Sequence, residues 1–330
     1  MSRWLRRIRW AAASPVLRCV GMAVRLLPWR CVRGIGRAIG TLAWLLLGTP
    51  RRRADENLCA VFPEMDARAR RAFTRRSFGH FACVGAECLA CGGARTDALW
   101  PRVHEPEALR RFVARCQPPD GVPGPVIVTA HFGNWELLGG LVSRTGGRFC
   151  TFARRMKHPE LERLVDALRR DNSMRVLYTD APPTTVLRTL RDGTGVSILP
   201  DQDITELEGV FVPFFGRPAW TPLAPARLAV LAKTDIWMPF LVRDGMDFRA
   251  VLEGPFEPDA TIHDKTERMI RLTGVWTRAL ENAIRRFPEQ WCWMHPRWRN
   301  TPDRIIRRTG QTVRELCPDG TICVHEGASA

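Results

Sequence analysis

One stretch of the chain brings together side chains that could move a proton. In VIVTAHFGNWELLG, residues 126–139, an apolar run leads directly into His131, Gly133, Asn134 and Glu136. Gly133 permits a tight or left-handed backbone, and Asn134 is a favourable helix N-cap. Glu136 would then lie in the first turn of a helix, where the helix dipole favours a carboxylate. These residue types in this order predict a strand, a sharp turn and a helix start around a histidine.

The spacing of His131 and Glu136 limits how they could cooperate. Five residues on a helix turn through about 140°, so two helical side chains at this spacing do not face each other. They can meet only if His131 lies in the loop and Glu136 folds back from the helix start. His131 would then be a general base for a hydroxyl, with Glu136 fixing its tautomer and stabilising the imidazolium. The alternative is structural, a histidine that closes the turn beside a helix-start carboxylate.

The rest of the sequence offers no signature of a metal or nucleotide site. The seven histidines are dispersed without an H-E-x-x-H motif, and neither a P-loop nor G-x-G-x-x-G stands at a strand–helix junction. We therefore expect no metal and no cofactor.

Eleven cysteines, an odd number, favour reduced thiols in the cytoplasm over a disulfide framework. Cys83, Cys88 and Cys91 follow the C-x4-C-x2-C spacing of an iron–sulfur centre, with Cys116 further on. The surrounding segment reads as an amphipathic helix, so we favour core packing of these small side chains.

The elements that would position His131 alternate between strand and helix patterns. Alternation of this kind predicts an α/β fold, with a mostly parallel central sheet flanked by helices. Open sheets of this class place their sites at the carboxyl ends of strands, where His131 would lie. We expect strands at 126–130, 175–178, 196–199, 236–242 and 248–252, and helices at 158–171, 184–191, 224–233 and 266–287. The pattern fades beyond about residue 301, which suggests a catalytic domain at 51–300 and a C-terminal tail at 301–330.

Residues 1–50 form a separate N-terminal segment with a membrane-associating composition. Four tryptophans stand among Leu, Val and Arg residues, and the charge-free stretch that follows the arginines, 38–50, is shorter than the roughly 20 residues of a span. Basic residues alternating with Leu and Trp suit an interfacial helix on an anionic leaflet. We therefore expect a membrane anchor that faces the cytoplasm.

The charge balance favours anionic partners. The formal net charge is +16, and 47 of the 50 basic residues are arginine. Guanidinium groups suit bidentate capture of phosphates, so nucleic acid, anionic lipid and phosphorylated or acidic substrates all fit. The tryptophan-rich N-terminus and the absence of a nucleic-acid motif argue against a nucleic-acid-binding protein.

Several motifs in order resemble one enzyme family. HFGNWE, preceded by RRRADENLCAVFPEM and followed by FARRMKHPELERLVDALRRD, RDGTGVSILPDQD, VFVPFFGRPAWTP and PEQWCWMHPRWRN, resembles the late (lauroyl/myristoyl-type) lipid A biosynthesis acyltransferases. That family lies within the H-x4-D/E glycerolipid acyltransferase superfamily, and the resemblance covers roughly residues 26–300.

The resemblance implies roles for further residues. Arg154 matches the family's first arginine, and Arg169, with Arg170 as an alternative, matches the second. Both would bind a phosphate or the phosphopantetheine of the donor, and Asp201, at the end of the VSILP strand, would belong to the substrate site. The FVPFFG segment could line an acyl-chain groove or pack in the core. The tryptophans of the last motif could form a structural lid or an interfacial patch.

The implied reaction is transfer of a fatty acyl chain from acyl carrier protein to a hydroxyl of a lipid A precursor. It would occur at the cytoplasmic face of the inner membrane, on an anionic membrane surface, and without a cofactor because a thioester is already activated. An acyltransferase for another lipid, such as a phosphatidylinositol mannoside or an ornithine-type lipid, remains an alternative. A nucleic-acid-binding or membrane scaffold protein is the alternative of another class.

Overall fold

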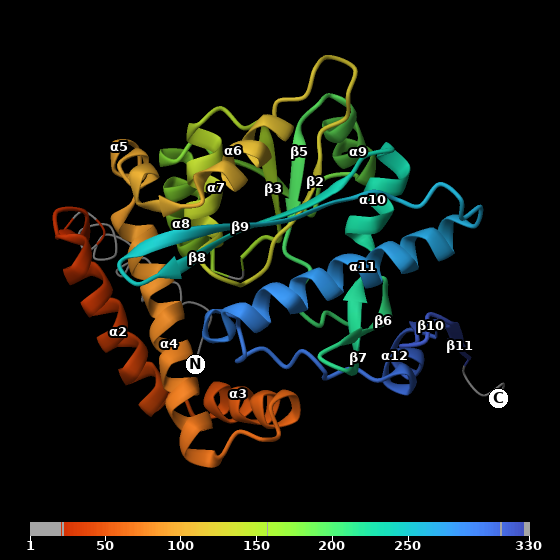
Figure 1. Cartoon of the computed structure of the whole chain (residues 1–330), viewed down its shortest axis with the longest axis horizontal. Helices are drawn as coiled ribbons and strands as arrows, with labels where there is room; N and C mark the ends of the chain where they lie inside the picture. Colours follow the sequence, from red (N-terminus) through yellow and green to blue (C-terminus); the bar gives the residue numbers. More distant parts are fainter. Residues whose placement is uncertain (1–20, 22, 157, 311, 327–330) are drawn as a thin grey trace.

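A seven-stranded sheet forms the centre of the molecule (Figure 1). The computed structural model describes residues 21, 23–156, 158–310 and 312–326. The strand order is β1-β9-β8-β2-β5-β3-β4, and β8, β2, β5, β3 and β4 run parallel to one another. The prediction of a mostly parallel sheet is confirmed; the exceptions are β9, antiparallel to β8, and β1, which runs parallel to β9. The strands are β1 (Val103–His104), β2 (Val126–Val128), β3 (Phe149–Ala153), β4 (Arg175–Tyr178), β5 (Gly195–Ile198), β8 (Ile236–Asp244) and β9 (Asp247–Phe256).

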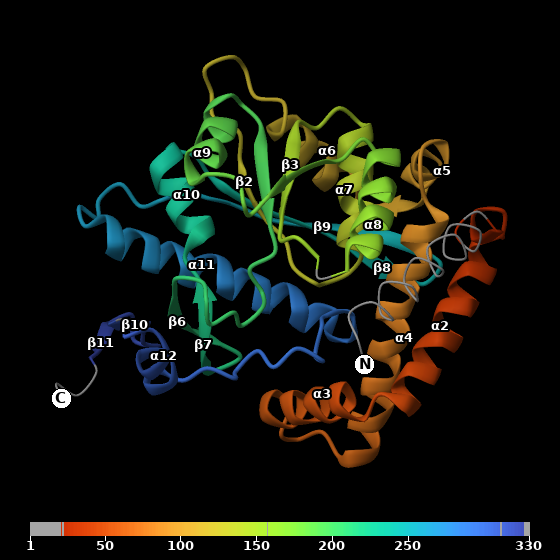
Figure 2. The same ribbon diagram turned by 180° about the vertical axis from the view of Figure 1, so that it is seen from behind.

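Strand β2 is apolar throughout because both faces of the sheet are covered. Val126 and Val128 belong to one core cluster, whereas Ile127 belongs to the other, as the alternation of side chains along a strand requires. Helices α6 and α7 pack on the face of Ile127, and α9, α10 and α11 pack on the opposite face (Figure 2). The helices named here are α6 (Pro106–Arg115), α7 (Trp135–Arg144), α9 (Pro183–Arg191), α10 (Ala224–Ala232) and α11 (Lys265–Arg286).

Two long helices run side by side at one end of the sheet. In α2 (Trp29–Leu46), a Cβ atom at Gly36 or Gly40 would lie within 2.7 Å of the backbone of α4 (Ala67–Ala90), so glycine permits close packing of these helices. Between them in the chain lies α3 (Gly48–Val61), and α5 (Ala94–Asp97) follows α4. The remaining large helix, α8 (Pro159–Asp171), follows β3. Cys83, Cys91 and Cys116 are buried, as the core-packing interpretation predicts.

A smaller four-stranded sheet, of order β11-β10-β6-β7, lies beside α11. Its strands are β6 (Gly209–Phe214), β7 (Arg217–Pro222), β10 (Val313–Leu316) and β11 (Ile322–His325), with α12 (Pro302–Thr309) leading into β10. The sequence pattern, which fades beyond about residue 301, predicted none of α12, β10 and β11, and β6 and β7 were not predicted either. Residues 302–325 do not trail away from the domain, because β10 pairs with β6 through Glu315 and Phe211.

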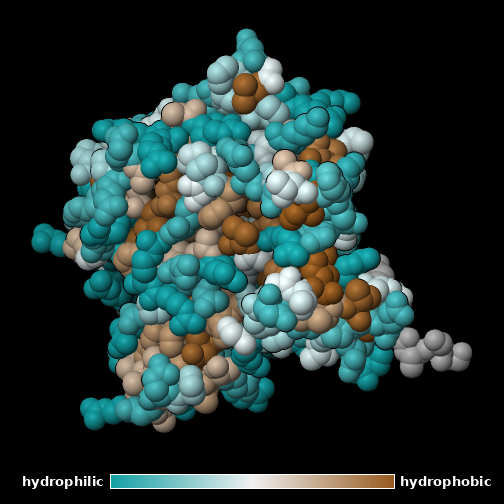
Figure 3. Space-filling model, turned by 45° about the vertical axis from the view of Figure 1, so that its right-hand side comes forward, coloured by the Kyte–Doolittle hydropathy of each residue, from teal (hydrophilic) through white to brown (hydrophobic). Residues whose placement is uncertain are grey.

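Hydrophobic side chains reach the surface at two notable places. On the face drawn in Figure 3 most of the surface is hydrophilic, with hydrophobic residues showing near its centre. The other place is α2, which exposes Ile35, Ile39, Leu42 and Leu46 along one stripe.

Trp4 and Trp10 of the expected anchor lie outside the described residues. Among the described helices no single one has the length and apolar character of a membrane span; α2 and α3 together would have them, but their axes differ by 92°.

Candidate active site

The ends of two neighbouring parallel strands bring His131 and Asp201 together. β2 and β5 pair directly, and the segments that follow them carry the two residues to the same edge of the sheet. Asp201 Oδ1 lies 2.9 Å from His131 Nδ1, and Asp201 Oδ2 accepts the backbone N–H of His131 at 2.9 Å. Trp291 Nε1 donates to the same Oδ2 at 3.1 Å. One carboxylate thus fixes both the backbone and the ring of the histidine.

These contacts also decide how the pair is charged. Burial lowers the pKa of His131, but the negative charge of Asp201, their hydrogen bond and the charge of Glu136 outweigh it, so the pKa is raised above its ordinary value. Burial likewise raises the pKa of Asp201, yet His131 and the donated hydrogen bonds hold it below its usual range. Asp201 therefore remains a carboxylate and stabilises an imidazolium.

The turn between β2 and α7 holds His131 at the strand end. Gly133 has φ +61°, and a Cβ atom there would lie 2.3 Å from the carbonyl oxygen of Leu241. Asn134 caps α7, because its Oδ1 accepts the backbone N–H of Leu137 at 3.1 Å. Trp135 then packs edge-on against the His131 ring, with centroids 5.1 Å apart. The predicted strand, turn and capped helix are all confirmed.

A cavity of about 480 Å³ opens beside His131. Most of its wall is apolar and comes from β2, β3, β5 and α7. His131, Glu136, Arg154 and Arg169 also line it. Asp201 does not line this cavity, since its side chain is 1% exposed and lies behind His131. The assignment of Asp201 to substrate binding is therefore corrected: its oxygen atoms contact His131 and Trp291 instead.

The hydrogen bonds of Glu136 come from an arginine, Arg169, and its influence on His131 is through charge. Arg169 Nη2 and Nε donate to the two oxygens of Glu136 at 2.6 and 3.1 Å, a bidentate pair. The expectation that Glu136 holds the His131 ring is corrected, because the hydrogen-bonded carboxylate at Nδ1 is Asp201. Arg169 anchors Glu136 in the cavity wall, so the anion bound by this arginine in the structure is a protein carboxylate.

Arg154 lies in a different environment. It directly follows β3, at the same edge of the sheet as His131, and its side chain is exposed while lining the cavity. This position suits contact with an anionic group at the cavity mouth.

Phe214, Phe215 and the three tryptophans of PEQWCWMHPRWRN form one aromatic cluster, separate from Phe211 and Trp220. Phe214 and Phe215 of the FVPFFG segment pack on Trp291 and Trp298, with centroid separations between 5.5 and 6.5 Å. Trp293 completes the cluster and is fully buried. These phenylalanines do not line the cavity, so core packing is the correct interpretation of FVPFFG. The tryptophans are structural, and Trp291 connects the cluster to Asp201.

His295 stabilises a neighbouring turn. Its Nε2 accepts the backbone N–H of Asp203 at 2.8 Å, and burial lowers its pKa to about 4. Asp203 in turn accepts the backbone N–H of Asn300 at 2.8 Å. Within the described residues no group of three or more His, Cys, Asp or Glu side chains could hold a metal ion.

Comparison with known proteins gives a consistent family. Residues 7–300 match the family model described as bacterial lipid A biosynthesis acyltransferase. The lipid A biosynthesis lauroyltransferase of Escherichia coli K12 is 25% identical over 295 residues, which cover 86% of this chain and 90% of that protein.

Two mycobacterial relatives match over shorter segments. The phosphatidylinositol mannoside acyltransferase of Mycobacterium tuberculosis H37Rv is 37% identical over 124 residues, 34% of this chain and 39% of that protein. The enzyme of the same name from Mycolicibacterium smegmatis is 28% identical over 188 residues, 54% of this chain and 58% of that protein. The chain thus matches less than two thirds of the length of these mannoside acyltransferases.

Proposed function

Because this chain belongs to the bacterial lipid A biosynthesis acyltransferase family, we propose that it transfers a fatty acyl chain from acyl carrier protein to a hydroxyl of a lipid A precursor. The observation that carries this proposal is the pairing of His131 with Asp201 at the edge of an apolar cavity. A base with a fixed tautomer beside a lipid-sized cavity fits acyl transfer to a hydroxyl. Neither a nucleic-acid-binding protein nor an inert scaffold requires this arrangement.

The geometry supports a base-catalysed mechanism. Asp201 occupies Nδ1, which leaves Nε2 of the His131 ring to accept the proton of the acceptor hydroxyl. The hydroxyl oxygen attacks the thioester carbonyl carbon and forms a tetrahedral intermediate. Its collapse breaks the C–S bond, and the departing sulfur takes the proton back from the imidazolium. Asp201 stabilises the positive charge of His131 between the two transfers.

The apolar wall and the charged residues of the cavity would bind different parts of the substrates. The apolar wall suits the acyl chain, and the exposed Arg154 suits an anionic group such as the donor phosphodiester or a phosphate of the acceptor. Arg169 would act indirectly, by holding Glu136 near His131. The net charge of +16 would attract both an acidic carrier protein and an anionic membrane.

A phosphatidylinositol mannoside is the second candidate acceptor. It rests on the two mycobacterial relatives, one of which is 37% identical over its matched segment. The same catalytic pair would serve either glycolipid, because both offer an acceptor hydroxyl at a membrane surface.

The test is mass spectrometry of membrane lipids from cells with and without the gene, with wild-type and His131→Ala rescue. We expect loss of one acyl-chain mass from lipid A, restored by the wild-type protein and not by the variant. Transfer by purified His131→Ala should fall by at least about a thousandfold while the variant remains folded, as judged by its circular dichroism spectrum. Retained activity would reject His131 as the base. Unchanged lipid A together with an altered mannoside or ornithine lipid would transfer the proposal to that acceptor.

A further inference from the structure

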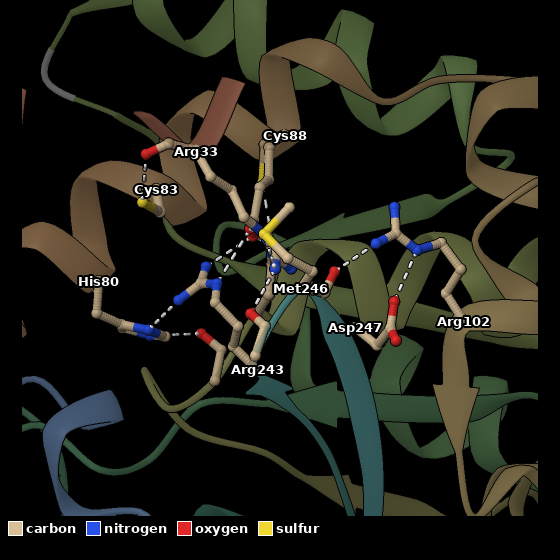
Figure 4. Close-up of polar contacts among 12 residues, drawn as sticks. Arg33, His80, Cys83, Cys88, Arg102, Arg243, Met246 and Asp247 are labelled. Atoms are coloured by element: carbon tan, nitrogen blue, oxygen red, sulfur yellow. Dashed lines mark hydrogen bonds and ion pairs between the residues drawn. The ribbon is translucent and has the colours of Figure 1, made fainter. Parts of the chain in front are cut away.

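A fully buried carboxylate lies behind the catalytic turn, on the side away from the cavity. Glu87 of α4 accepts hydrogen bonds from side chains on three other elements. Arg33 of α2 donates through Nε at 2.7 Å, and Arg243 of β8 donates through Nη2 at 2.7 Å and Nε at 3.1 Å. The third donor is Nδ2 of Asn134, at 2.8 Å from Glu87 Oε2. In Figure 4 the guanidinium groups of Arg33 and Arg243 approach each other from different elements.

His80 holds the same turn at a second point. It lies two helical turns before Glu87, and its Nε2 is 3.1 Å from the carbonyl oxygen of Gly133. Its Nδ1 accepts from Arg243, which leaves the proton on Nε2 for the carbonyl. Burial and the nearby arginine lower the pKa of His80 well below its ordinary value, so the ring stays neutral. The hydrogen bonds of His80 and Glu87 with the turn therefore both depend on Arg243 as well.

The contact with Asn134 controls the start of α7. Asn134 has one acceptor and one donor group, and each is used: Oδ1 accepts from the N–H of Leu137, and Nδ2 donates to Glu87. A flipped amide would place donor against donor at Leu137 and acceptor against acceptor at Glu87. Glu87 thus fixes the orientation in which Asn134 caps the helix. His131 stands three residues before this cap and Glu136 two residues after it.

We propose that Glu87 is a positioning residue for catalysis: through Asn134 it holds the β2–α7 turn and so keeps His131 aligned with Asp201 and the cavity. The inference builds on the proposed acyl transfer, but its structural part can be measured without substrate. Glu87 also joins this turn to α2 through Arg33, so a displacement of α2 would reach the catalytic turn by way of two hydrogen bonds.

The first variant to test is Glu87→Gln, which keeps the shape of the side chain and removes its charge. The matched control is Asp235→Asn, which breaks another largely buried carboxylate–arginine pair, with Arg115 at 2.5 Å, at the opposite end of β8. Amide hydrogen exchange is followed by mass spectrometry in peptides covering residues 130–140. We expect about fivefold faster exchange or more there in Glu87→Gln, the factor associated with a lost N-cap, and no change there in Asp235→Asn.

Kinetics of the folded protein give the second measurement. Misalignment of His131 should lower kcat by roughly 10- to 100-fold and leave KM within about twofold, because much of the apolar cavity wall that would hold the acyl chain lies on β2, β3 and β5. Unchanged exchange and unchanged kcat in Glu87→Gln, with only a lower melting temperature, would overturn the proposal. If the wild type transfers no acyl chain, the proposed function fails, while the exchange comparison still decides whether Glu87 holds the turn.

A donor–acceptor swap tests the route through Asn134. In Glu87→Gln/Asn134→Asp, the new amide at 87 can donate to the new carboxylate at 134, and aspartate is itself a good N-cap. We expect slower exchange and a higher kcat than in Glu87→Gln alone. The route through Asn134 would be rejected by a double variant that is as thermally stable as Glu87→Gln but shows neither slower exchange nor a higher kcat.

Discussion

At the scale of single residues, His131 is balanced between burial and two nearby carboxylates. A general base must be neutral before it accepts a proton, so activity rises with pH as the imidazolium loses its proton. Because the carboxylates raise the pKa of His131, this rise is expected above the ordinary histidine value of about 6.5. His131 is therefore a stronger base than a free imidazole, and its neutral form is reached at a higher pH than in a free histidine.

Replacing Asp201 by Asn tests its hold on His131. The neutral amide cannot stabilise an imidazolium, so we expect kcat to fall by about 10²- to 10⁴-fold. The acidic limb of the kcat/KM profile should also move to lower pH, because the largest influence that raises the pKa of His131 is lost. Steady-state kinetics from pH 5 to 9 measure both effects. An acidic limb that stays in place would show that Asp201 does not set the proton affinity of the base.

Glu136→Gln provides the contrasting experiment. Its carboxylate raises the pKa of His131 less than Asp201 does and hydrogen-bonds Arg169. We expect a loss of about tenfold or less and a smaller shift of the acidic limb. The same pH series compares the two variants. If Glu136→Gln and Asp201→Asn lower kcat and shift the acidic limb equally, Glu136 must contact the histidine once substrate is bound, as the H-x4-E motif first suggested.

Sequence reasoning selected both His131 and Asp201 as site residues but did not pair them, for a geometric reason. Asp201 lies 70 residues further on and becomes a neighbour only because β5 inserts between β2 and β3. A parallel sheet can be predicted from alternating patterns, whereas the order of its strands cannot. The motif spacing therefore favoured Glu136, the nearest carboxylate in sequence. The roles of Glu87 and His80 could not be predicted, because isolated polar residues in an amphipathic helix are expected on its solvent-exposed side.

At the scale of elements, the predictions succeeded where the apolar residues of a segment followed a single helical or strand periodicity. The strand at 175–178 matches β4, and the helices at 158–171, 184–191, 224–233 and 266–287 match α8 to α11 within a residue or two. The hairpin of β6 and β7 was missed because proline and glycine interrupt it. Pro213 and Pro218 stand opposite each other in the register, where their lack of an N–H is tolerated in a short sheet.

The turn between β2 and α7 gives a prediction about stability at this scale. Gly133→Ala meets two penalties: a positive φ, and a Cβ atom 2.3 Å from the Leu241 carbonyl oxygen. Gly216→Ala, at the β6–β7 turn, meets only the first, because φ is +71° and no atom lies within 4 Å. We expect Gly216→Ala to lower the unfolding free energy by about 1 kcal/mol and Gly133→Ala by clearly more, about 3 kcal/mol. Urea denaturation measures both, and equal losses would contradict the close contact at Gly133.

At the scale of the whole molecule, two buried neutral histidines make stability depend on pH. Burial lowers the pKa of His80 and brings that of His295 to about 4, whereas an unfolded histidine titrates near 6.5. Below about pH 6.5 the unfolded chain therefore binds protons that the folded chain does not, and stability is lost as pH falls toward 4. His131 acts in the opposite direction, since its raised pKa adds stability that is present below about 6.5 and lost above it.

His295→Gln separates one of these contributions from the others. Glutamine can still accept the N–H of Asp203 but has no proton to gain. Between pH 6.5 and 4, we expect the unfolding free energy of the variant to fall less steeply than that of the wild type, by up to about 1.4 kcal/mol per pH unit. Denaturation curves at several pH values measure the difference. Parallel pH dependences would show that His295 titrates normally in the folded protein.

The stripe on α2 makes the membrane hypothesis testable on the folded molecule. Leu42 and Leu46, the latter 71% exposed, lie one turn apart, and the arginines at positions 30, 37, 52 and 53 are exposed on α2 and α3. Such a surface suits an anionic leaflet. Leu42→Ser/Leu46→Ser should weaken binding to phosphatidylglycerol vesicles more than about tenfold, since each leucine loses roughly 1 kcal/mol or more of burial. Val275→Ser, on the exposed side of α11, should bind like the wild type. Vesicle sedimentation at low and high salt distinguishes the apolar from the electrostatic part, and equal binding by all three proteins would exclude α2 as the contact surface.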